Sequence, residues 1–162
     1  MLFRSAYTWS SPYVDNSQVV IVRADSDIRD LAGLAGKAVA VQTDTPVLKA
    51  LQKNGKREAL GKTFKKIVVS PNYNNAVMEL EASSVDAVAL DIGVAQEKLK
   101  VGKFRMLEEV VITEKYGIGF RKGNTELRDK VEATLKEMVA DGTAAQISAK
   151  YFNGRDCLII GK

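Results

Sequence analysis

Residues 38–51 hold the first side chains whose types and spacing could do chemistry. In the run AVAVQTDTPVLKAL, a short apolar segment stops at a polar turn, and an amphipathic helix begins behind Thr45 and Pro46. Thr45 is expected to cap this helix and Pro46 to be its first residue. Unpaired N–H groups in a first turn, with the helix dipole, favour an anion such as a carboxylate. The alternative is a corner that only connects two elements.

Other kinds of chemistry find little support in the composition. The 162 residues include no histidine, which removes the commonest general base and metal ligand. Ser10, Ser11 and Cys157 therefore have no histidine to activate them, and a single cysteine offers no spaced metal ligands. No cofactor is expected. Lysine and arginine look scattered among acids despite a net charge of +4, so nucleic-acid binding is not expected.

Short apolar strands alternate with amphipathic helices along most of the chain. Strands are expected at 18–23, 38–42, 66–69, 87–90 and near 104–107. Helices are expected at 28–34, 47–53, 74–81 and 92–99, with a basic loop between 53 and 66. Strands that are apolar throughout, at short spacing from helices, indicate an α/β fold with a mainly parallel sheet covered on both faces.

The C-terminal third is expected to be helical after an extended segment at 116–121. Asn124 or Thr125 caps a helix that runs to about Ala140, and Gly142 separates it from a last helix that ends near Lys150. The first of these helices has an apolar face whose residues recur at three- and four-residue spacing: Leu127, Val131, Leu135 and Met138. This face must be buried against another part of the structure.

The N-terminal residues show neither the apolar core nor the small-residue cleavage site of a signal peptide. No segment of the sequence approaches the roughly 20 apolar residues that span a bilayer. The sequence alone therefore predicts a soluble chain.

Five motifs follow one another along the chain: PYVDNSQVVIVR, LAGLAGKAVAVQTDTP, YNNAVMELEASSVDAVALDIGVAQ, YGIGFRKGN and ISAKYFNG. In this order they resemble the motifs of bacterial extracellular solute-binding proteins of family 3, the amino-acid-binding proteins of ABC importers. The resemblance runs from about Trp9 to Gly154 and implies a type II periplasmic-binding-protein fold. In that fold, two lobes joined by crossing strands clamp an amino acid. By this comparison the chain is N-terminally truncated: residues 1–17 are a remnant of lobe one and the hinge, 18–121 form lobe two, and 122–162 are helices that pack on lobe one.

The resemblance also implies a ligand site in lobe two. Thr45 corresponds to a residue that binds the ligand carboxylate through its hydroxyl and backbone, and Asp91 to one that accepts the α-ammonium group. Gln42 is expected to face the ligand side chain. Asp44 lies beside the expected carboxylate, at a position where the family usually has glycine, and Pro46 lacks an N–H that could donate. Asp91 has an alternative role as the cap of the helix that begins at Ile92.

The function implied is noncovalent capture of a zwitterionic amino acid, weakly or not at all by a single lobe, in partnership with an ABC permease. Such proteins are periplasmic or extracellular and are not enzymes. The apolar face of 127–138 and strand 18–23 are expected to lack partners, which predicts a homodimer formed by exchange of the C-terminal helices. Alternatively, these helices fold back on their own lobe. Two alternatives remain: a nonbinding, self-associating structural or interaction module, and an enzyme of the same fold, such as a dehydratase.

Overall fold

The computed structural model describes residues 4–152 and 157–160. The last two residues of the ISAKYFNG motif, Asn153 and Gly154, lie outside the described residues. The chain divides into two units, each described here by itself. The sheet unit comprises residues 17–113, and the terminal unit combines residues 1–16 with 114–162.

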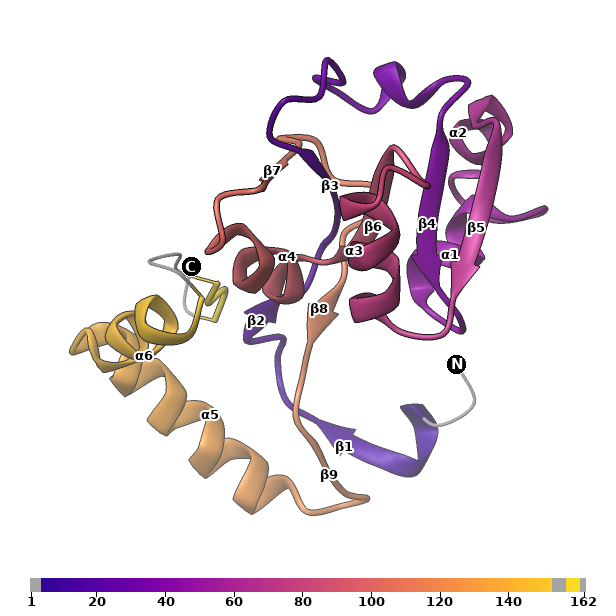
Figure 1. The fold of residues 1–162 in the computed structure, drawn as a ribbon. Coiled ribbons are helices and arrows are strands. Elements are labelled where there is room, and N and C mark those ends of the chain that lie inside the picture. Colours follow the sequence, from indigo (N-terminus) through magenta and orange to yellow (C-terminus); the bar gives the residue numbers. More distant parts are fainter. Residues whose placement is uncertain (1–3, 153–156, 161–162) are drawn as a thin grey trace. The chain divides into compact units, whose positions relative to one another are not determined.

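A five-stranded sheet organises the sheet unit, with the strand order β5-β4-β6-β3-β7 (Figure 1). The strands are β3 (Gln18–Arg23), β4 (Ala38–Gln42), β5 (Lys66–Ser70), β6 (Ala87–Asp91) and β7 (Phe104–Met106). β4 runs parallel to β5 and β6, whereas β3 runs antiparallel to β6 and β7. The sheet is therefore mainly parallel, as predicted, and β3 is the one reversed strand among these five.

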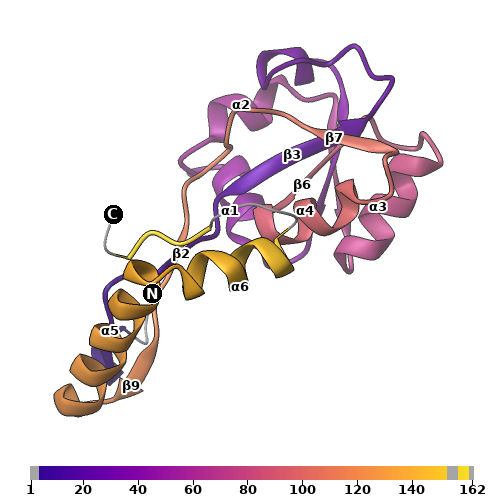
Figure 2. The ribbon, with the colours of Figure 1, turned by 90° about the vertical axis from the view of Figure 1, so that its left-hand side faces the viewer.

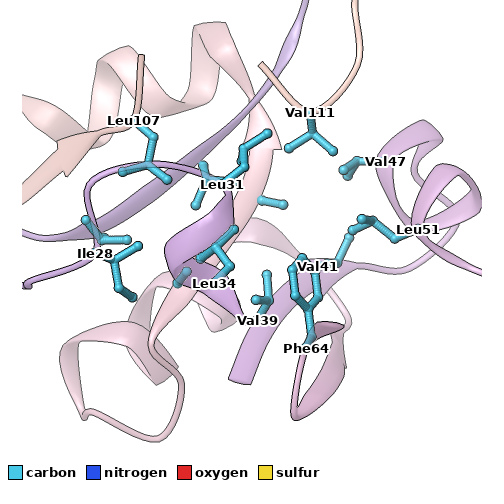
Figure 3. Packing of buried hydrophobic residues seen from close by; sticks show 14 of the residues in the cluster. Ile28, Leu31, Leu34, Val39, Val41, Val47, Leu51, Phe64, Leu107 and Val111 are labelled. Carbon is cyan, nitrogen blue, oxygen red and sulfur yellow. The ribbon is translucent and has the colours of Figure 1, made fainter. Parts of the chain in front are cut away.

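Helices cover both faces of this sheet, which confirms the α/β prediction. Alternate residues of β4 enter opposite cores: Val39 and Val41 pack with η2 (Ala32–Leu34), α1 (Pro46–Leu51) and Phe64, as Figure 3 shows. Ala38 and Ala40 face the second core, which holds α3 (Tyr73–Glu81) and α4 (Ile92–Leu99). Each face thus buries its own apolar layer.

The predicted helix over 28–34 is wrong, because only the short η2 forms there. Distant side chains take the backbone groups that a helix would use. The Arg105 guanidinium donates to the carbonyl oxygens of Ser26 and Ile28, and the Leu31 N–H donates to Glu109 Oε2 at 2.7 Å. These tertiary hydrogen bonds hold the segment in an irregular path.

The expected basic loop between 53 and 66 contains a helix, α2 (Glu58–Thr63). α2 passes so close to α1 that a Cβ added to Gly61 would lie 2.1 Å from the Leu51 carbonyl oxygen. Glycine therefore permits the packing of these two short helices. The expectation that strand 18–23 lacks partners is also wrong, since β3 pairs on both sides and most of it is buried.

The described residues of the terminal unit form two small antiparallel strand pairs, a short 3-10 turn and two α-helices. η1 (Arg4–Ala6) precedes β1 (Tyr7–Trp9), which pairs with β9 (Gly119–Arg121), while β2 (Val14–Asp15) pairs with β8 (Lys115–Tyr116). The helices are α5 (Thr125–Ala140) and α6 (Thr143–Tyr151), which contact each other (Figure 2). As predicted, Asn124 caps α5, accepting from the Leu127 N–H at 3.3 Å, and Gly142 separates α5 from α6 with φ 84°.

The apolar face of α5 is less buried than its spacing predicts. No described residue of this helix is fully buried, and Leu127 is 47% exposed. Leu135 and Met138 line a hollow of about 280 Å³ together with residues of α6, β2 and the C-terminal segment. The face is thus only partly covered within its own unit.

Candidate functional site

Polar residues gather at one edge of the five-stranded sheet. Because β4, β5 and β6 are parallel, their carboxyl ends meet there, and Gln42 lies opposite Ser70. The reversed strand β3 begins at the same edge, where Gln18 is opposite Asp91. We call this row the carboxyl edge. In open α/β sheets this is where ligands bind, outside the ends of the strands.

Asp91 ends β6 and occupies the N-cap position of α4 without capping the helix through its side chain. Instead, its half-buried carboxylate accepts a hydrogen bond from Gln18 Nε2. Gln18 is fully buried, with 0% of its surface exposed. Sequence reasoning missed Gln18, although a polar residue at the head of the apolar run QVVIVR is a usable signal. The buried amide fixes the carboxylate at the carboxyl edge.

Thr45 is the cap of α1, and Pro46 is the first helical residue, which confirms both local predictions. The Thr45 Oγ1 donates to the Gln42 carbonyl oxygen at 2.7 Å and accepts from the Leu48 N–H at 3.4 Å. The side chain is 8% exposed. The hydroxyl proton of Thr45 is therefore directed at its own turn.

Asp44 has φ 58°, in the left-handed region that favours glycine. This backbone conformation is a physical reason why the family that the chain resembles usually has glycine at this position. Aspartate adopts the region more readily than most side chains do. Its side chain is exposed, which leaves its charge in solvent beside the cap of α1.

Gln42, the last residue of β4, lines a surface hollow of about 470 Å³ between the start of α3 and one side of α4. The other lining residues are Asn72, Tyr73, Asn74, Gly93, Val94, Glu97 and Lys98. Lys98 Nζ donates to Asn74 Oδ1 at 2.8 Å across its rim. Asp44, Thr45 and Asp91 are not among the described lining residues, so the structure places only Gln42 in this hollow.

The described part of the chain contains no cluster of three or more histidine, cysteine, aspartate or glutamate side chains that could hold a metal. Within the same residues, no helix combines the length and apolar character needed to cross a bilayer.

The sheet order and the two helical layers define the class as the type II periplasmic-binding-protein fold. A solved ancestral cationic amino acid solute binding protein has a TM-score of 0.79 and 30% identity, with 91% of this chain and 62% of that chain covered. The sequence model of the family of bacterial extracellular solute-binding proteins, family 3, matches residues 4–154. The chain belongs to this family, whose members are solute-binding proteins and not enzymes, as predicted.

Two curated relatives give the scale of the match. The chain is 30% identical over 151 residues to ABC transporter arginine-binding protein 1 of Escherichia coli K12, covering 90% of this chain and 59% of the relative. It is 32% identical over 151 residues to the histidine-binding periplasmic protein of Salmonella typhimurium LT2, covering 87% and 56%. The chain thus spans less than two thirds of the length of the relatives that it matches.

Proposed function

We propose that the carboxyl edge is half of a noncovalent binding site for a zwitterionic amino acid. Asp91 accepts the α-ammonium group, backbone N–H groups around Thr45 bind the carboxylate, and Gln42 faces the ligand side chain. The supporting observation is the state of Asp91, whose carboxylate is held by buried Gln18 and makes no capping hydrogen bond to α4. Membership of a family of solute-binding proteins supports the same role.

The geometry of Asp91 suits an ammonium group. A carboxylate has about four lone-pair positions, and the Gln18 amide uses one of them. Charge-assisted hydrogen bonds from an ammonium group are short and about twice as strong as neutral ones. Asp91 is half-buried, which strengthens this attraction relative to bulk water.

Contacts to the ligand carboxylate depend on the backbone more than on the Thr45 hydroxyl. That hydroxyl already donates to the Gln42 carbonyl oxygen, and Pro46 has no N–H to offer. The exposed carboxylate of Asp44 stands close by in sequence and repels an anion. Both features weaken binding.

Affinity is expected to be low because this unit covers one side of a ligand. High-affinity sites bury most of a ligand surface. Without enclosure, we expect a dissociation constant above about 1 mM. L-arginine and L-histidine are the first probes, because the relatives are named for arginine and histidine.

The test is an NMR titration of the chain with each amino acid, with sodium chloride added to the same ionic strength as the control. Amide signals of 42–45 and 91–93 should move with the amino acid and not with the salt. Asp91→Asn keeps the acceptor for Gln18 but removes the charge, so the shifts should disappear. Asp44→Asn should strengthen binding severalfold by relieving repulsion.

Asp27→Asn is the matched control, because Asp27 follows β3 at the opposite edge of the sheet and is exposed. It removes the same charge and should leave the shifts unchanged. Equal responses of Asp91→Asn and Asp27→Asn would contradict the proposed site. A submillimolar dissociation constant for the monomer would contradict the proposal that one lobe captures the amino acid only weakly.

The wider role follows from the family. We propose that the sheet unit corresponds to one lobe of a two-lobed solute-binding protein that delivers its ligand to an ABC permease. A periplasmic or extracellular location is part of this proposal, supported by a relative that is named a periplasmic protein.

A second candidate function is a nonbinding, self-associating module. The observation that favours it is apolar exposure in the terminal unit, where Leu127 is 47%, Ile147 46% and Tyr151 63% exposed. Apolar surface of this kind favours association in water. Sedimentation equilibrium over a range of concentrations should then show a homodimer, formed by exchange of α5 and α6 between two copies. A monomer at all concentrations would exclude this second function.

A further inference from the structure

Residues 49–66 concentrate the positive charge of the chain. This segment holds seven lysine or arginine residues and one acidic residue, so its formal charge exceeds the +4 of the whole chain. The expectation of evenly scattered charge is therefore wrong here. Its six lysines, all exposed, form what we call the lysine patch: Lys49, Lys53, Lys56, Lys62, Lys65 and Lys66.

The fold brings these lysines together on α1, α2 and the start of β5. α1 and α2 are in contact (Figure 1), and Lys53 and Lys62 line the same surface hollow of about 330 Å³. The Lys65 N–H donates to the Lys37 carbonyl oxygen at 2.9 Å, which ties the patch to the beginning of β4. Lys65 and Lys66 thus lie on the amino-terminal side of the sheet.

Little within the segment neutralises the patch. Glu58 pairs with Lys62, with 2.7 Å between Nζ and Oε1. Arg57 is directed elsewhere, because its guanidinium donates to the carbonyl oxygens of Val111 and Val110 at 2.6 and 3.1 Å. Lys53, Lys56 and Lys65 take part in none of the ion pairs found among the described residues. Their charges therefore remain available to a partner.

We propose that the lysine patch binds an anionic lipid surface. Lysines on flexible stems act as hydrated point charges and suit a disordered array of phosphates. Polybasic segments are attracted to anionic bilayers by about 1 kcal/mol per lysine. A stable protein interface fits less well, since lysine is depleted and aromatic residues are enriched there.

Single-stranded nucleic acid also fits less well. Such sites stack bases on exposed aromatic rings. The one aromatic residue of segment 46–66 is Phe64, which is 8% exposed and belongs to the core. The charge of the patch therefore lacks the stacking platform that a nucleic-acid surface provides.

A lipid contact through Lys65 and Lys66 leaves the proposed amino-acid site open. Lys65 and Lys66 stand at the amino end of β5, whereas Ser70 ends that strand at the carboxyl edge. This part of the patch is thus at the opposite end of β5 from the carboxyl edge. This inference goes beyond the proposed function and does not depend on it.

The test is co-sedimentation of the full chain with vesicles of equal parts phosphatidylglycerol and phosphatidylcholine, and with vesicles of phosphatidylcholine alone. Binding should require phosphatidylglycerol and should be lost in about 1 M salt, where the Debye length is about 3 Å. Changing Lys53→Gln, Lys56→Gln and Lys65→Gln together should lower the partition coefficient about 100-fold, since each lysine contributes roughly fivefold.

The matched control combines Lys122→Gln, Lys130→Gln and Lys136→Gln, which removes the same charge from exposed positions in the terminal unit. It should bind within a fewfold of the unchanged chain. Circular dichroism checks that both triple variants fold. Equal losses in the two variants, binding to phosphatidylcholine alone, or tighter binding to a DNA oligonucleotide than to the vesicles would each overturn the proposal.

Discussion

The sheet unit and the terminal unit are built from the same chain but bury their apolar side chains very differently. All but four of the fully buried hydrophobic residues that the structure describes lie in the sheet unit; the exceptions are Phe120, Ala144, Cys157 and Ile160. The sheet unit therefore has two continuous cores, whereas the terminal unit has local pairs and a partly covered hollow.

This contrast follows from the number of secondary-structure layers within each unit. A mainly parallel sheet with helices on both faces buries most residues of β3, β4 and β6, so these apolar runs are satisfied within 97 consecutive residues. Two helices and two short strand pairs supply too few layers to enclose an apolar face. We infer that the sheet unit carries most of the folding free energy and that the terminal unit opens more easily.

The largest expected effect comes from matched leucine truncations in the two units. Leu80→Ala in α3 removes a side chain with 0% exposure and should lower the free energy of unfolding by about 2–5 kcal/mol. Leu127→Ala in α5 removes one that is 47% exposed and should cost less than about 0.5 kcal/mol. Urea unfolding followed by circular dichroism measures both. Similar losses would show that the terminal unit has a core of its own.

The helix caps give a smaller and more local comparison. Thr45 caps α1 and Asn124 caps α5, and each accepts from the N–H three residues later. Thr45→Ala and Asn124→Ala should each weaken their helix by about 1 kcal/mol. Only the loss at Thr45 should appear in global unfolding, because α1 packs into a core.

Hydrogen exchange distinguishes the two cap variants. In Asn124→Ala, faster exchange should stay within the first turns of α5, because we infer that the terminal unit opens separately from the sheet unit. Thr45→Ser serves as the control, since it keeps the hydroxyl oxygen and should restore most of the stability of α1. Global destabilisation by Asn124→Ala would mean that α5 folds together with the sheet unit.

Local chemistry made much of the sheet unit predictable. The apolar runs located the strands, and Thr45 and Pro46 marked the start of α1, since these signals act between neighbours in the sequence. In the terminal unit, Gly142 marked the break after α5 for the same reason. Segment 28–34 could not be predicted in this way. Its backbone partners, Arg105 and Glu109, lie far along the chain.

The places of Asp91 and Thr45 in the fold were predictable to a similar degree, whereas their role in a ligand site stays a prediction. Asp91 and Thr45 stand at ends of elements that the sequence marks clearly. The partnership of Asp91 with Gln18 was not, because it depends on β3 running antiparallel to β6. Strand direction is set by the pairing of the whole sheet, and a run such as QVVIVR reads alike in either direction.

The smallest expected effects come from two carboxyl groups at the surface, one in each unit: Glu58 is half-buried and Asp141 is exposed. Side-chain hydrogen bonding from Lys62 and then the Asn54 N–H lower the pKa of Glu58 below its ordinary 4.5. The Thr143 N–H lowers the pKa of Asp141 below its ordinary 3.8. A lowered pKa stabilises the fold above the ordinary value, and that contribution is lost as pH falls through the folded-state value.

Acid should therefore weaken α2 below about pH 4.5 and the start of α6 below about pH 3.8, both slightly, because both groups remain in contact with solvent. NMR titration of the two carboxyl carbons measures both pKa values directly. Salt should raise the pKa of Glu58 toward its ordinary value more than that of Asp141, because a lysine charge is screened and a backbone N–H bond is screened less. Lys62→Gln should have the same selective effect, and an equal response of both groups would show that a shared field, not local hydrogen bonds, sets their pKa values.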